Sequence, residues 1–290
     1  MQPLIWENRP DGLRAPALVC AFTGWNDAGD AASAALQFIG SSLGATRFAR
    51  IDPEEFYDFQ ATRPHIRLVE GKSREIDWPE VEVYAARVPR APRDLVLLHG
   101  PEPSLRWRKF MQQIVDLSEA LGVQMVVTLG ALLADVPHTR PVHITGFASD
   151  EGLVGRLGLQ SSNYEGPTGI TGAIMAACQD AALPCASLWA SVPHYVAAAP
   201  NPKAALALVR KLEGLVGVSV DAQELESDAG RYEAQVSAAV AQDPEVQAFV
   251  ERLEAAALVQ EAGATPDVPS GDVIARDFQR FLRQQGPGET

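Results

Sequence analysis

The sequence is short of cysteines and has no long apolar run. Its cysteines are Cys20, Cys178 and Cys185, an odd and sparse set that favours buried, reduced thiols over a disulfide framework. No stretch of about 18 consecutive apolar residues is present, so we expect no membrane span. The first residues lack the basic and apolar segments of a secretory signal. Together these absences predict a cytoplasmic protein.

Positive charge is also scarce. Lysine and arginine number 24 against 37 aspartate and glutamate residues, which gives a net charge of −13. Nucleic acids and anionic membranes attract basic surfaces, so we expect neither as a main partner. The acidity is uneven, because residues 219–290 hold 14 acidic and 5 basic residues, a net charge of −9, which leaves −4 for residues 1–218.

The apolar content of the chain is high enough for a large core, at 47% of 290 residues. Short apolar runs alternate with segments of helical periodicity. We expect strands near 17–22, 95–98, 123–130, 142–148 and 185–190, and helices from about 28, after a cap at Ser104, and over 169–182. Fully apolar strands that alternate with helices predict an α/β fold with a mainly parallel sheet covered on both faces. The runs 66–69 and 81–88 alternate polar and apolar residues, which favours antiparallel or edge strands.

Residues 219–290 are predicted to form an acidic α-helical extension to an α/β core that spans residues 1–218. Asp221 and Glu224 have the spacing of a capping box at the start of a helix. The pair Asp243-Pro244 predicts that a second helix starts there, with proline in its first turn. Residues 263–269 interrupt the pattern, and Ser270 is predicted to cap a last helix.

A parallel α/β sheet binds ligands beyond the carboxyl ends of its strands. The candidate ligand-binding residues are therefore the polar and glycine residues of the loops that meet there: Asn26, Asp27, His99, Glu102, His138, Glu165, Thr168, Gly169 and His194. If these loops converge on one cleft, the histidines and glutamates supply acid and base groups. The catalytic residues, if any, are not identified by the sequence.

Several of these candidates have a structural interpretation that is equally open. Asp27 fits a helix cap, His99 a half-buried imidazole, and Glu102 a cap or an ion pair. The glycines of 166–172 either expose backbone N–H groups to an anion or allow close packing of the helix that follows. This segment lacks the lysine of a P-loop and does not follow a strand as a G-x-G-x-x-G motif does.

Two kinds of chemistry have no support in the sequence. Asp135 and His138 are three residues apart, but no third ligand has a recognisable spacing, so we expect no metal site. A G-x-S-x-G elbow is absent, which disfavours an ordinary α/β-hydrolase. No motif points to a cofactor, and we expect none.

Four segments taken together resemble the PAC2 family. They are GWNDAG at 24–29, PHTRP at 137–141, YEGPTGI at 164–170 and SLWASVPHY at 187–195. They occur in the order of the family across residues 1–218, and it is the set rather than any single segment that is specific. The helical extension is similar to that of the actinobacterial branch of the family.

The resemblance implies a three-layer α/β/α fold similar to that of purine nucleoside phosphorylases and peptidyl hydrolases. It also implies a homo-oligomer, with a trimer as the expected form. The family is named for a proteasome assembly chaperone, which implies a non-catalytic assembly or interaction factor linked to proteasome subunits. An alternative stays open here, namely a small-molecule-binding protein or a hydrolase- or phosphorylase-like enzyme with its pocket at the strand ends.

Overall fold

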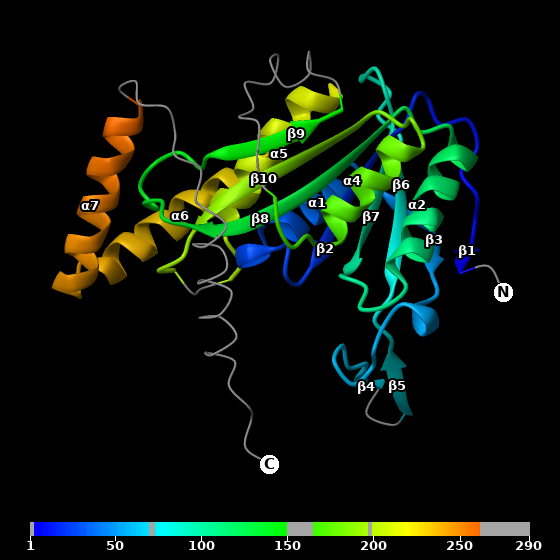
Figure 1. The fold of residues 1–290 in the computed structure, drawn as a ribbon, viewed down its shortest axis with the longest axis horizontal. Coiled ribbons are helices and arrows are strands. Elements are labelled where there is room, and N and C mark those ends of the chain that lie inside the picture. The colour runs from blue at the N-terminus through cyan, green and yellow to red at the C-terminus, as the bar shows by residue number, and fades with distance from the viewer. Residues whose placement is uncertain (1–2, 70–72, 150–164, 197–198, 262–290) are drawn as a thin grey trace.

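The structure, a computed structural model of the chain, describes residues 3–69, 73–149, 165–196 and 199–261. An eight-stranded sheet runs through its centre in the order β1-β3-β6-β7-β2-β8-β10-β9 (Figure 1). Its four central strands are parallel, and they are β7 (Leu95–Pro101), β2 (Ala17–Thr23), β8 (Met125–Ala134) and β10 (Cys185–Pro193). Their nearly continuous apolar sequence suits strands that are covered on both faces. The predicted α/β fold with a mainly parallel sheet is confirmed.

Antiparallel strands flank this parallel centre. On the β7 side lie β6 (Val81–Ala86), β3 (Thr46–Ile51) and β1 (Leu4–Trp6), each antiparallel to its neighbour. On the other side β9 (Ile144–Ala148) pairs antiparallel with β10. The alternating pattern of 81–88 therefore predicted an antiparallel strand correctly.

Helices cover both faces of the sheet. On one face lie α1 (Ala31–Ser42), which follows the short 3-10 turn η1 (Ala28–Asp30), and α5 (Pro202–Val216). On the other face lie α2 (Trp107–Leu121) and α4 (Ile170–Asp180). Strand β2 contributes side chains to the cores on both faces of the sheet, because successive side chains of a strand point to opposite faces. Its residues Ala17, Val19 and Ala21 join the first core, whereas Leu18, Cys20 and Phe22 join the second.

The predicted cap of helix α2 at Ser104 is wrong. The helix begins at Trp107, after Arg106, whose φ of 53° lies in the left-handed region. Ser104 instead donates its backbone N–H to the carbonyl of Phe56, which follows the 3-10 turn η2 (Pro53–Glu55), at 2.8 Å. Its side chain is two residues too early for a cap, because the chain still has to turn through Arg106 before it becomes helical.

Two helices form the described part of the predicted extension. Helix α6 (Gln223–Val240) begins after Ala222, one residue later than the predicted capping box requires. The Asp221 carboxylate therefore accepts from the Gln223 N–H, at 3.1 Å, and the capping box with Glu224 is wrong. Helix α7 (Pro244–Glu261) starts at Pro244 as predicted.

Helix α6 packs into the body of the molecule. Leu225 belongs to the same core as Leu212 and Val216 of α5. The buried residues of α6 continue along one face as Ala229, Tyr232 and Val236. The division of the chain at residue 218 stays a prediction, and the predicted last helix after Ser270 lies outside the described residues.

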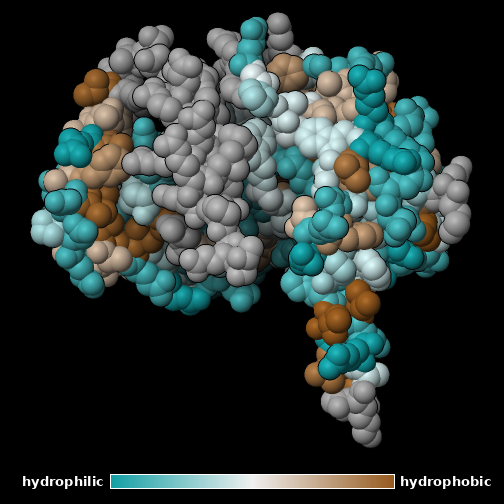
Figure 2. Space-filling model, turned by 60° about the horizontal axis from the view of Figure 1, so that its bottom comes forward, coloured by the Kyte–Doolittle hydropathy of each residue, from teal (hydrophilic) through white to brown (hydrophobic). Residues whose placement is uncertain are grey.

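Strands β4 (His65–Val69) and β5 (Ser73–Asp77) form a separate two-stranded antiparallel sheet. This hairpin projects from the body as a narrow arm (Figures 1 and 2). The run 66–69 is thus an antiparallel strand, as its alternation predicted. Within the ranges that the structure describes, no helix has the length and apolar character needed to cross a membrane.

Candidate functional site

Asn26, Glu102 and the start of helix α4 form one hydrogen-bonded cluster at the carboxyl ends of β2 and β7. The Asn26 amide donates from Nδ2 to Glu102 Oε1 at 2.7 Å. The backbone N–H of Ile170 donates to the same carboxylate oxygen, also at 2.7 Å. The hydroxyl of Thr171 donates to Asn26 Oδ1 at 3.1 Å, and both of these side chains are fully buried. The sequence analysis missed the role of Thr171.

Tyr57 lies beside this cluster and was also missed. Its hydroxyl donates to the carbonyl of Pro101 at 2.6 Å. Burial raises the pKa of Tyr57, and the charge of Glu102 raises it further, so the phenol stays protonated. No spacing in the sequence connects Tyr57 to Glu102, because the two come from segments that meet only in the fold.

The glycine-rich start of α4 is packed tightly against Asn26. A Cβ atom on Gly169 would lie 2.1 Å from Asn26 Oδ1, so no larger residue fits without a shift. The positive end of the helix dipole attracts an anion, and here the Glu102 carboxylate lies on its first N–H group. Both interpretations of 166–172, anion binding and close packing, therefore apply here. Helix α4 packs closely on Asn26, and the anion that accepts its first N–H is the Glu102 side chain of the same chain.

Asp27 lies at the start of helix α1. Its Oδ1 accepts from the backbone N–H of Ala32 at 2.6 Å and from that of Ser33 at 3.3 Å. Burial raises the pKa of the Asp27 carboxyl, and these hydrogen bonds lower it in part. The arrangement is that of a buried helix cap.

His99 faces the layer of α1 rather than that of α4. Its Nε2 lies 3.2 Å from Nε2 of Gln37 on α1. Burial lowers the pKa of His99, while the charge of Glu82 on the neighbouring strand raises it. His99 and Glu102 therefore contact helices on opposite faces of the sheet.

His138 and His194 form a second cluster, where the extension meets the ends of β8 and β10. The buried His138 ring has its Nδ1 2.7 Å from the Tyr195 hydroxyl and its Nε2 3.0 Å from the Ser237 hydroxyl on α6. His194 has its Nδ1 2.9 Å from a carboxylate oxygen of Asp135. Burial lowers the pKa of His138. Sequence reasoning missed Ser237, because nothing in a helical stripe marks one serine as a partner.

Aromatic and charged contacts complete this second cluster. The Phe249 ring of α7 meets the rings of His194 and Tyr195 edge to face, with centroids 5.5 and 5.9 Å apart. The Lys203 amine donates to the His138 carbonyl and pairs with Glu233 of α6. These contacts hold α6 and α7 against the body.

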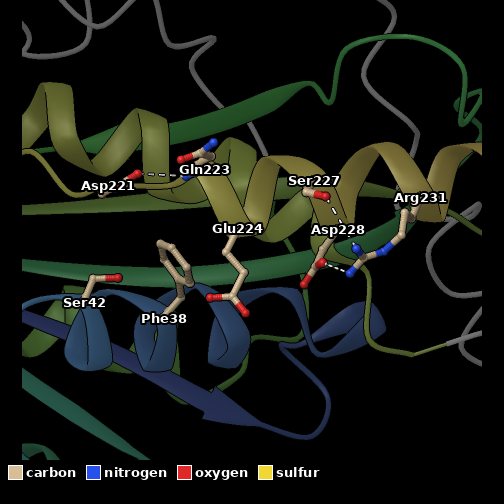
Figure 3. A pocket seen from close by; sticks show the side chains of 8 residues that line it. All are labelled: Phe38, Ser42, Asp221, Gln223, Glu224, Ser227, Asp228 and Arg231. Atoms are coloured by element: carbon tan, nitrogen blue, oxygen red, sulfur yellow. Dashed lines mark hydrogen bonds and ion pairs between the residues drawn. The ribbon is translucent and has the colours of Figure 1, made fainter.

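The remaining candidates are Glu165 and Thr168, and the Thr168 hydroxyl donates to the carbonyl of Gly169 at 3.4 Å. Glu165 and Thr168 are exposed, just before α4. A cavity of about 550 Å³ lies between α1 and α6, and Figure 3 shows Phe38 and Glu224 pointing toward each other across it. None of the nine candidate residues lines this cavity. Among the described residues, no group of three histidine, cysteine or acidic side chains could hold a metal ion.

The model of one protein family, described as the PAC2 family, matches residues 21–240. The chain is a member of the PAC2 family. The match runs to the last residue of α6, so it includes a helix that the sequence analysis assigned to the extension. None of the curated proteins compared with the chain matches it.

Two solved PAC2 structures are similar to this member of the family. A PAC2 family protein from Streptomyces avermitilis is 47% identical, with a TM-score of 0.76, over 81% of this chain and 99% of the other. The proteasome-assembly chaperone homologue Rv2125 of Mycobacterium tuberculosis is 44% identical, with a TM-score of 0.75 and the same coverage. The archaeal proteasome activator PbaB of Pyrococcus furiosus shares the fold at 16% identity and a TM-score of 0.66, over 82% of this chain and 99% of the other.

Proposed function

We propose that this PAC2 protein is a non-catalytic assembly or interaction factor that acts on proteasome subunits. Its relative from Mycobacterium tuberculosis, 44% identical, is described as a proteasome-assembly chaperone homologue. The structural observation that carries the proposal is the Glu102 cluster. One oxygen of the Glu102 carboxylate accepts hydrogen bonds from the Asn26 amide and from the N–H of Ile170. Asn26 itself is fully buried.

The dispersal of the candidate residues supports the same proposal. A general base works on a proton that lies about 3 Å away. His99 contacts α1, Glu102 contacts α4, and His194 pairs with Asp135 in the second cluster. These groups serve the packing of separate helices, which favours a scaffold that presents a surface over one that turns over a small molecule.

The experiment is a binding test with the full chain and the proteasome core subunits of the same organism. The chain, tagged and immobilised, should retain unassembled core subunits at physiological salt and release them once the core particle is complete. An unrelated acidic protein of equal net charge is the control bait, because the −13 charge alone attracts basic proteins. Retention by neither bait, or equally by both, contradicts the proposal.

The enzyme alternative has its own test. A ligand that binds the folded state raises the melting temperature by mass action. A screen of nucleosides, phosphate and small peptides should therefore leave the melting temperature unchanged. A reproducible rise with one ligand, lost in the Glu102→Gln variant, would support a pocket at the strand ends instead.

The proposal includes a homo-oligomer in the cytoplasm, as the family resemblance and the sequence suggest. The expected trimer has three times the 31.1 kDa mass of one chain. Sedimentation of the purified protein tests the number of copies.

A further inference from the structure

Two adjoining loops at the amino ends of the parallel strands form a cationic surface on an acidic protein. One loop is residues 8–16, between β1 and β2, and the other is residues 87–94, between β6 and β7 (Figure 1). Together they have a net charge of +3, whereas that of the whole chain is −13. Their five arginines, called the arginine surface below, are Arg9, Arg14, Arg87, Arg90 and Arg93. The Glu102 and His138 clusters lie at the opposite ends of the strands.

A buried aspartate holds the two loops together. The Asp94 carboxylate is only 1% exposed, and it accepts from the backbone N–H of Arg14 at 2.8 Å and from that of Val88 at 2.9 Å. It also pairs with the Arg14 guanidinium at 3.0 Å. Pro92 packs on the end of α5, where a Cβ on Gly217 would lie 3.0 Å from it. The loops are therefore held in place before any partner arrives, which lowers the entropy cost of binding.

Three of the arginines carry a charge that no carboxylate of the described residues pairs with. The Arg87 guanidinium donates to the backbone carbonyls of Asp11 and Gly12 rather than to a carboxylate. Within the part of the chain that the structure describes, Arg90 and Arg93 form no ion pair, and the buried Nε of Arg93 has no hydrogen-bond partner. Arg87 and Arg90 are exposed, and Arg93 is half-buried. These guanidinium groups therefore retain donors for an anion from outside the chain.

We propose that the arginine surface binds an acidic segment of a partner protein. The proposal rests on the proposed function, under which this segment belongs to the proteasome subunits. A guanidinium binds a carboxylate through two parallel N–H···O bonds, so three unpaired arginines within seven residues suit a run of aspartates or glutamates. A positive surface on an otherwise acidic chain also steers an acidic segment to this end of the molecule.

Nucleic acid fits this surface less well than an acidic peptide does. Proteins that bind single strands stack the bases on aromatic side chains, and neither loop contains an aromatic residue. A long polyanion also extends beyond the arginine surface onto the rest of the chain, whose acidic groups repel phosphates. A short acidic segment stays within the two loops.

The first test measures the binding of a fluorescent octaglutamate peptide to the full chain by anisotropy. The peptide should bind, and added salt should weaken the binding by screening. In the Arg90→Gln, Arg93→Gln double variant the affinity should fall about tenfold or more, since two charge-assisted contacts are lost while Asp94 still holds the loops. The matched control, Arg67→Gln with Arg231→Gln, removes the same charge from two exposed arginines that form ion pairs. Circular dichroism confirms that each variant is folded.

A second probe is an oligothymidylate of the same charge as the peptide. It should bind more weakly than the peptide, because it gains no stacking on the arginine surface. Tighter binding of the oligothymidylate would overturn the proposal. So would a failure of the wild-type chain to bind the peptide, or an equal loss of affinity in the double variant and its control.

The second test repeats the capture of unassembled proteasome subunits with the same variants. The Arg90→Gln, Arg93→Gln chain should retain fewer subunits than the wild-type chain, and the control variant should retain as many. Equal retention by the double variant and the wild type would overturn the proposal. If the wild-type chain binds the peptide but retains no subunits, the proposed function fails, whereas the arginine surface is supported as a site for an acidic segment.

Discussion

The Asn26 amide donates to the Glu102 carboxylate at 2.7 Å, and this one bond joins the loops that follow two adjacent parallel strands. The same carboxylate oxygen accepts the first N–H of helix α4. Two strands on one side and one helix on the other are thus fixed by a single acceptor.

Replacing Glu102 with glutamine should destabilise the fold by about 1–3 kcal/mol, because two charge-assisted hydrogen bonds become neutral ones. The helix dipole of α4 also loses its anion. Urea unfolding of the full chain measures the change. The matched control is Glu119→Gln on the exposed end of α2, which should change the free energy of unfolding by less than about 0.5 kcal/mol. Equal effects of the two variants would contradict the role given to Glu102.

Replacing Gly169 with alanine should destabilise the protein by about 2–4 kcal/mol, since the new methyl group would lie 2.1 Å from Asn26 Oδ1. Gly230 provides the control, because it lies within α6 and a Cβ there meets nothing within 4 Å. The Gly230→Ala variant should gain about 0.5–1 kcal/mol through helix propensity. Thermal and urea unfolding of the two variants should therefore move in opposite directions.

The stability of the protein should fall as the pH drops below about 6.5, and His138 should account for part of the fall. Burial lowers the pKa of His138 in the folded state. As the pH falls, the unfolded chain therefore takes up the proton first. The stability that His138 contributes is complete above the unfolded pKa, and it is lost as the pH falls from the unfolded pKa through the lower folded pKa. His99 and His143, whose pKa values burial also lowers, act in the same direction.

The His138→Gln variant isolates this contribution. The slope of unfolding free energy against pH should decrease by at most about 1.4 kcal/mol per pH unit, the value for one proton. His65→Gln, on the exposed hairpin, serves as the control. Urea unfolding at several pH values between about 5 and 8 gives the slopes. An unchanged slope in His138→Gln would contradict the role given to His138.

Replacing Phe249 with alanine should release helix α7 while the body stays folded. The ring packs against His194 and Tyr195, and its loss removes the main aromatic contact of this helix. Limited proteolysis between α6 and α7, near Asp243, should become faster. The Leu258→Ala variant changes an exposed residue of the same helix and should be cleaved at the wild-type rate. Equal rates for the two variants would contradict the docking role of Phe249.

The main elements of the fold could be predicted from local patterns alone. The run from Ala17 to Phe22 is apolar on both faces, and such a strand is stable only between two helical layers. Pro244 after Asp243 marked a helix start without any tertiary information, because proline suits the first turn. The predicted caps at Ser104 and Asp221 failed by one or two residues, since where a helix begins depends on how the preceding chain is held.

The sequence also predicted which polar residues follow the strands, but not how they are paired. Both interpretations of Glu102 were open, and only its distance to Asn26 and to the Ile170 N–H assigned it to helix α4. His99 and Glu102 are three residues apart, yet they contact opposite faces of the sheet. Local sequence determines which surface of an element is apolar, because that depends on spacing along one strand or helix. Tertiary structure decides which polar groups meet, because their partners come from segments that only folding brings together.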